Sequence, residues 1–74
     1  MTLQELPVGE QAKVISVEGV DDISVRMMEM GLTPGVELTM IGAALFGDPL
    51  EIELRGYHLS LRKSEAERVL IARM

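Results

Sequence analysis

The chain contains no cysteine and no tryptophan, and its aromatic side chains are one phenylalanine and one tyrosine. Without cysteine the protein has no disulfide, no thiolate metal ligand and no thiol nucleophile, and its composition fits a reducing compartment. With so few aromatic residues, the hydrophobic 47% of the sequence must build an aliphatic and methionine core. We therefore do not expect an aromatic-lined groove of the kind that binds proline-rich peptides.

Long apolar runs and basic clusters are also missing. No hydrophobic stretch reaches the length of a membrane span, and the segment Met1–Glu5 lacks the basic start of a signal peptide, so we expect a cytoplasmic protein. The net charge is −5, and the basic residues form no block larger than Arg62–Lys63. Because nucleic-acid binding depends on a basic surface, neither DNA nor RNA is expected as a direct ligand.

The 74 residues suffice for a single domain, 1–74, and the segment Met30–Gly35 is its strongest structural signal. Gly31 suits the left-handed conformation that closes a helix, and Pro34 with Gly35 suits the centre of a type II turn. This segment predicts a helix before it and strands after it.

The predicted helix covers about residues 21–30, with Asp21 as its N-cap. Its core-facing stripe is spaced at i, i+4 and i+7 and consists of Ile23, Met27 and Met30. Val25 and Met28 lie off this stripe, so we expect at least one of them to be partly exposed.

Alternation of apolar and polar residues predicts five short strands, at about residues 11–18, 36–41, 50–55, 57–62 and 69–72. Adjacent Val14 and Ile15 interrupt the first alternation, which indicates either a bulge or burial on both faces. If Arg55 and Gly56 form a two-residue hairpin loop, Leu54 lies opposite Tyr57 and both point inward.

Short helical turns near residues 2–6 and 63–67, and a turn at Gly47, Asp48 and Pro49, connect these elements. The predicted fold class is mostly β, a small five-stranded SH3-like barrel with one inserted α-helix. Closure into a barrel is preferred because it removes most exposed strand edges.

Five short segments occur in a characteristic order: Leu6–Glu10, Met30–Gly35, Gly47–Pro49, Arg55–Tyr57 and Leu61–Ala66. In this order, and over nearly the whole chain, the sequence resembles the FeoA family, small cytosolic components of bacterial ferrous iron uptake. The resemblance implies an SH3-like barrel that acts through FeoB, a membrane transporter with its own GTPase domain. It also implies kinship with the C-terminal domain of some metal-dependent repressors.

Docking on a FeoB-type transporter, with modulation of its assembly or activity, is therefore the expected function. Val25 and Met28 on the helix and Phe46 at a loop tip are the apolar candidates for this contact. Arg26 and Glu29 would form its polar rim, or a solvated i, i+3 pair. The alternative is that the apolar residues cap the barrel end and belong to the core.

The metal candidate is His58, the only histidine, because the predicted hairpin register places it opposite Glu53 on the outward face. Two ligands make an open, weak site for Fe2+ or Zn2+, which a second chain or the transporter would have to complete. The alternative is a solvated pair without metal. No cofactor is expected to be required.

An enzyme is not expected either. Catalysis would need a nucleophile, a base and an oxyanion donor that converge, and the sequence indicates no such set.

Two other functions stay open: a metal carrier or sensor, and a repressor module. The repressor module is disfavoured because the sequence starts at Met1 without a helix-turn-helix segment ahead of the barrel. Homodimer formation and recruitment by the partner to the inner face of the plasma membrane are also left open.

Overall fold

The computed structural model describes residues 1–74 and contains five strands, two α-helices and two short 3-10 helices. Their order is η1 (Leu3–Glu5), β1 (Gln11–Val17), α1 (Asp22–Glu29), β2 (Glu37–Ala43), η2 (Leu45–Gly47), β3 (Leu50–Leu54), β4 (Tyr57–Leu61), α2 (Lys63–Ala66) and β5 (Val69–Arg73). All strand pairs are antiparallel, in the sheet order β4-β3-β2-β1-β5. The mostly β prediction with one inserted helix is confirmed.

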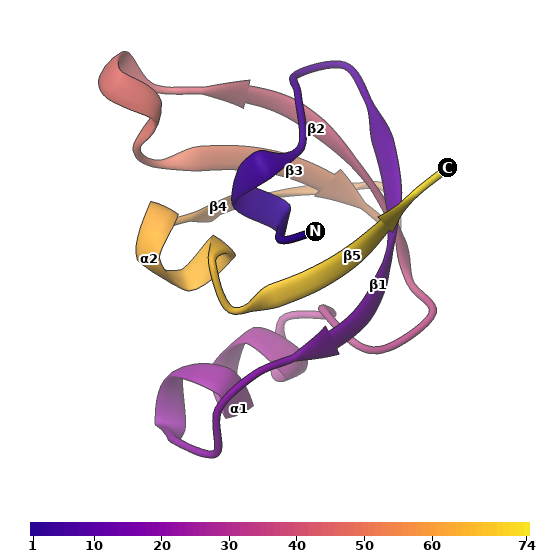
Figure 1. Ribbon diagram of the computed structural model, residues 1–74, viewed down its shortest axis with the longest axis vertical. Coiled ribbons are helices and arrows are strands. Elements are labelled where there is room, and N and C mark those ends of the chain that lie inside the picture. Colours follow the sequence, from indigo (N-terminus) through magenta and orange to yellow (C-terminus); the bar gives the residue numbers. More distant parts are fainter.

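The sheet curls around its core, and α1 lies outside one end of it (Figure 1). Strands β4 and β5 are the two edges of the sheet, and no ladder joins them. The short helices η1 and α2 contact each other, and Leu3 of η1 and Ala66 of α2 are fully buried. The barrel is therefore not closed by strand pairing between β4 and β5, and the N-terminal segment instead adds one bridge to β5, between Thr2 and Leu70.

The core is one cluster of sixteen buried hydrophobic residues, and none of them is aromatic. Alternation along β3 is clear, because Leu50, Ile52 and Leu54 are buried whereas Glu51 and Glu53 are exposed. A strand with one apolar face and one charged face has a fixed register, because a slip by one residue would bury the charges. The prediction from composition, a core of aliphatic residues and methionine, is confirmed.

The hairpin between β3 and β4 has the predicted register, with Leu54 opposite Tyr57. Arg55 and Gly56 have φ values of 50° and 85°, which suit a two-residue loop whose twist matches the strands. Tyr57 lies on the predicted face, opposite the buried Leu54, but it is 43% exposed and therefore not part of the buried core. Its ring lies at the hairpin end, where the phenol hydroxyl donates a hydrogen bond to the carbonyl oxygen of Met30.

The first strand contains the bulge that its adjacent apolar residues predicted. The pairing of β1 with β5 shifts between Val14 and Ser16, so Ile15 has no regular partner. Ile15 is 53% exposed whereas Val14 is buried. The alternative, burial on both faces of the strand, is therefore wrong.

Candidate functional site

The start of α1 is fixed by its N-cap residue and by an ion pair. Asp21 accepts a hydrogen bond from the Ser24 N–H at 3.2 Å, as its predicted capping role requires. The Arg68 guanidinium donates to both carboxylate oxygens of Asp21, at 2.6 and 2.8 Å. Arg68, and then the Ser24 N–H, hold the pKa of the Asp21 carboxyl below its usual range. The first turn of α1 is thus bound to the segment before β5.

The end of α1 has the hydrogen bonds of a Schellman motif. The N–H of Gly31 donates to Met28 at 3.0 Å, and that of Leu32 donates to Met27 at 3.1 Å. Gly31 has a φ of +115°, and a Cβ atom there would lie 2.6 Å from the Tyr57 hydroxyl oxygen. The positive φ therefore favours glycine at this position, and a larger residue would also displace the Tyr57 hydroxyl from its place at the end of the helix.

The predicted turn after the helix also forms. The Val36 N–H donates to the Thr33 carbonyl at 3.1 Å, and Gly35 has the positive φ, +91°, that a type II turn needs at its third residue. The turn leads directly into β2, which holds the end of α1 beside the barrel. The ion pair between Asp21 and Arg68 holds its start.

The outer side of α1 exposes the apolar residues that fall off its core stripe. Val25 is 46% exposed and Met28 is 38% exposed, whereas Met27 is fully buried. The alternative in which Val25 and Met28 belong to the core is therefore wrong. We call the exposed side formed by Val25, Arg26, Met28 and Glu29 the α1 surface.

The charged residues of the α1 surface do not pair with each other. Arg26 lies 3.9 Å from the Glu65 carboxylate of α2, and its side chain is 67% exposed. Glu29 takes part in no ion pair. The predicted solvated pair between Arg26 and Glu29 therefore does not form. Arg26 instead makes a long contact with Glu65, which joins α1 to α2.

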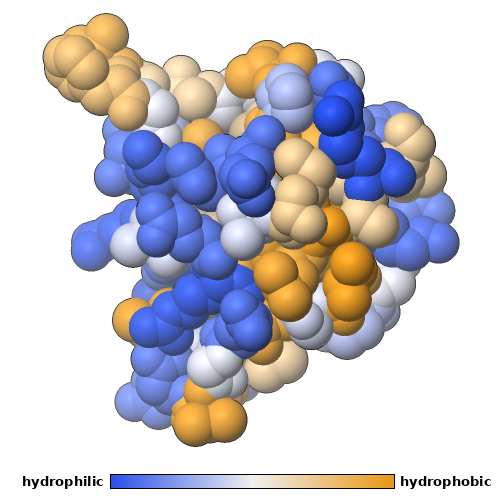
Figure 2. All heavy atoms as spheres, in the orientation of Figure 1, coloured by the Kyte–Doolittle hydropathy of each residue, from blue (hydrophilic) through white to orange (hydrophobic).

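Phe46 lies at a different place from the α1 surface. It is 91% exposed, and its neighbour Leu45 is 80% exposed. Figure 1 shows η2 at the end of the molecule opposite α1, and Figure 2 shows an apolar projection there. We call Leu45 and Phe46 the η2 tip. The predicted partner-binding residues therefore form two separate regions, and the sequence analysis did not single out Leu45.

The loop that follows the η2 tip is attached to α2. Gly47 has a φ of +77°, and the Asp48 carboxylate accepts a hydrogen bond from the Lys63 N–H at 3.0 Å. Lys63 is the first residue of α2, whose free N–H groups need acceptors. Asp48, which was predicted only as a turn residue, thus also accepts the first N–H of α2.

The predicted metal pair lies on the outward face of the β3–β4 hairpin. Glu53 and His58 are opposite each other, and the His58 Nε2 is 3.5 Å from the Glu53 Oε2. Both side chains are well exposed. No group of three or more His, Cys, Asp or Glu residues is placed to hold a metal ion. The pair alone offers two ligands, as the sequence analysis expected.

The sequence model of the FeoA domain matches residues 1–73. The chain belongs to the FeoA domain family. Over 69 residues it is 35% identical to a protein of Porphyromonas gingivalis in which Fe(2+) transport protein A is fused to the Fe(2+) transporter FeoB. The match covers 93% of this FeoA domain and 8% of the fusion protein.

Solved structures of FeoA proteins have the same fold as this domain. An FeoA-like protein of Clostridium acetobutylicum is 38% identical, with a TM-score of 0.92 over 100% of this chain and 86% of that one. The FeoA of Stenotrophomonas maltophilia, a prokaryotic SH3 domain protein complexed with zinc, is 37% identical, with a TM-score of 0.86 over 97% and 89%. The SH3-like fold is thereby confirmed.

The fold of this FeoA domain also occurs in metal-dependent regulators. The IdeR of T. acidophilum has a TM-score of 0.88 at 16% identity, over 100% of this chain and 34% of that one. At this identity the likeness concerns the fold alone.

No helix of the FeoA domain has the length and hydrophobicity that a membrane-spanning helix needs.

Proposed function

We propose that this FeoA domain is a non-enzymatic accessory protein of ferrous iron transport, which docks on a FeoB-type transporter and modulates its assembly or activity. The fusion protein of P. gingivalis carries this proposal, because it joins an FeoA part and FeoB in one chain. A covalent link keeps two parts at high effective concentration, which favours a functional contact between them. The domain would act in the cytoplasm, recruited to the inner face of the plasma membrane by its partner.

The α1 surface is the docking site that we propose. Val25 and Met28 offer partly exposed apolar area on a helix whose two ends are fixed, so docking would cost little ordering. Methionine adapts its shape to a partner, and Arg26 with Glu29 supplies the polar rim that interfaces usually have. Phe46 would be a second, peripheral contact at the opposite end.

Co-purification with the FeoB-type transporter of the same organism tests docking. We expect Val25→Asp and Met28→Asp to reduce recovery of the complex, because each would bury a charge in an apolar contact. Ile15→Asp is the matched control, since Ile15 is an apolar residue of similar exposure on β1. Unchanged recovery with both α1 variants would contradict the proposed surface, and no recovery with the unaltered chain would contradict docking.

A second candidate function is that of a weak carrier or sensor of a divalent transition metal. The zinc complex of S. maltophilia FeoA and the 3.5 Å contact between Glu53 and His58 favour it. A second copy or the transporter would have to supply further ligands, because two protein ligands fill only half of the tetrahedral coordination that zinc takes in proteins. Metal analysis of the purified chain, repeated with His58→Ala, tests this function; equal metal content would exclude the pair.

A further inference from the structure

A hollow of about 470 Å³ lies where α1, the end of β4 and α2 meet. Its apolar lining includes Ile23, which is half-buried, and Leu61, which is buried. Its polar lining residues are Arg26 of α1, Ser60 of β4, Arg62 between β4 and α2, and Glu65 of α2. We call it the α1–β4 hollow. It borders the α1 surface, because Arg26 belongs to both.

The α1–β4 hollow differs from the other hollows of the molecule in the sign of its charge. Its charged lining residues are two arginines, Arg26 and Arg62, and a single carboxylate, Glu65. In the hollow beside the β3–β4 hairpin loop, by contrast, carboxylates outnumber cations, and the hollow beside η1 contains one of each. A positive lining is notable on a chain with a net charge of −5, since it selects a ligand opposite in sign to the rest of the surface.

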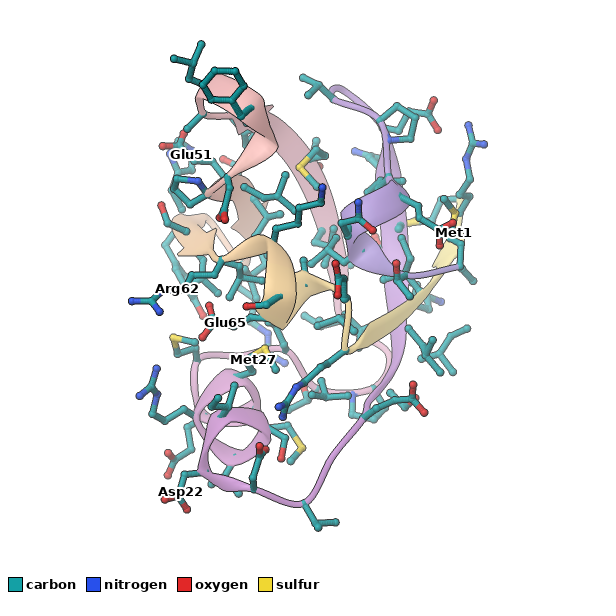
Figure 3. All side chains as sticks on the ribbon, turned by 60° about the vertical axis from the view of Figure 1, so that its left-hand side comes forward. Met1, Asp22, Met27, Glu51, Arg62 and Glu65 are labelled. Atoms are coloured by element: carbon teal, nitrogen blue, oxygen red, sulfur yellow. The ribbon has the colours of Figure 1, made fainter.

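Neither arginine of the hollow has a close carboxylate partner. Arg68 and Arg73 each bind a carboxylate within hydrogen-bonding distance, whereas Arg62 forms no ion pair and Arg26 reaches Glu65 only at 3.9 Å. The Glu65 carboxylate already accepts the Arg62 backbone N–H at 2.9 Å, and its side chain is only 16% exposed. Figure 3 shows Arg62 and Glu65 on one side of the molecule, above α1, with Arg62 extending outward.

We propose that the α1–β4 hollow binds an aspartate or glutamate side chain on a peptide segment of the docking partner. Arginine binds carboxylates through paired, charge-assisted hydrogen bonds, and the Ser60 hydroxyl offers a further donor. The apolar lining would receive a hydrophobic residue beside the acid, which a free inorganic anion does not possess. This inference rests on the proposed function and adds the chemistry of the segment that the α1 surface contacts.

The test compares charge-neutralising variants in binding to the detergent-solubilised FeoB-type transporter. We expect Arg26→Gln and Arg62→Gln each to weaken binding about tenfold, and high salt to reduce this difference. Arg55→Gln is the matched control, because Arg55 lies outside the hollow on the hairpin loop. It should change binding less than twofold. Circular dichroism melts of each variant ensure that only folded proteins are compared.

A charge swap identifies the acidic residue. Arg62→Glu should abolish binding, and one aspartate or glutamate of the transporter, changed to lysine in a scan of its cytosolic acids, should restore it. Failure of every exchange would overturn the inference. If Val25→Asp weakens binding while Arg26→Gln and Arg62→Gln match Arg55→Gln, docking stands and the acidic segment is wrong. If the unaltered chain does not bind, the proposed function itself fails.

Discussion

The α1 surface and the η2 tip both expose apolar side chains, but the structure holds them in different ways. Val25 and Met28 are about half exposed on a helix that is capped at both ends and tied to the barrel. Leu45 and Phe46 project almost completely into solvent, and Phe46 has a φ of +66°, which is costly for a non-glycine residue. The first region is a capped helix face with a charged rim, whereas the second is a projecting loop tip.

This difference determines what each region requires of a partner. A face such as the α1 surface can pack against a flat or shallow surface, and its charged neighbours can pair at the rim. A projecting phenylalanine contributes strongly only if the partner offers a deep, well-packed pocket. The α1 surface therefore has the better claim to be the main contact, and the predictions below test that order.

The largest expected effect comes from loosening the end of α1. Gly31→Ala should lower the free energy of unfolding by about 2–3 kcal/mol, because the left-handed backbone is strained and the new Cβ meets the Tyr57 hydroxyl. Urea unfolding measures the loss. Gly35→Ala is the control, since its φ is also positive but no atom lies within 4 Å of the new Cβ. It should cost only about 1 kcal/mol, and equal losses would contradict the steric argument.

The second prediction compares the two regions directly in transporter binding. Val25→Asp should weaken binding at least about tenfold, because it places a charge at the centre of an apolar contact. Phe46→Asp should weaken it by no more than about threefold, as expected for a peripheral contact. Titration of the labelled domain with the solubilised transporter measures both. A larger loss of binding with Phe46→Asp than with Val25→Asp would indicate that the η2 tip is the main contact.

Sequence reasoning predicted the elements of the fold well because each had a local signal. Asp21 and Gly31 marked the ends of α1, and alternation along β3 gave the correct inward residues. The burial of Tyr57 was not predicted correctly. Strand alternation indicates the face on which a residue lies, but it does not indicate how far the core extends along that face. At the hairpin end, the hydrogen bond to Met30 keeps the phenol at the surface.

The site was less predictable because its parts come from distant segments. Exposure of Val25, Met28 and Phe46 followed from their place off the core pattern, but their separation into two regions depends on how the sheet curls. The α1–β4 hollow joins Arg26 to Arg62, and no local pattern links residues so far apart in sequence. Positions set by tertiary packing therefore needed the structure.

The third prediction concerns a substitution that weakens the attachment of the start of α1, so that this region becomes less firmly held, like the η2 tip. Asp21→Asn should lower the melting temperature by a few degrees at pH 7, since it removes the ion pair with Arg68. Because the folded pKa of Asp21 is lowered, its stabilisation is present above the unfolded pKa of about 4 and is lost as pH falls through the folded value. The two proteins should therefore converge at low pH. Asp22→Asn, which breaks no ion pair, should melt like the unaltered chain throughout.

The smallest expected effect concerns the β3–β4 hairpin, which belongs to neither of the two regions. If Glu53 and His58 bind zinc weakly, zinc at a concentration equal to its dissociation constant stabilises the fold by only about 0.4 kcal/mol. NMR of the His58 ring is the more sensitive measurement: its signals should shift with zinc, and Glu53→Gln should reduce the shift. Signals that stay put would exclude the pair. A shift that strengthens only when the transporter is added would mean that the partner completes the site, which would link metal binding to docking.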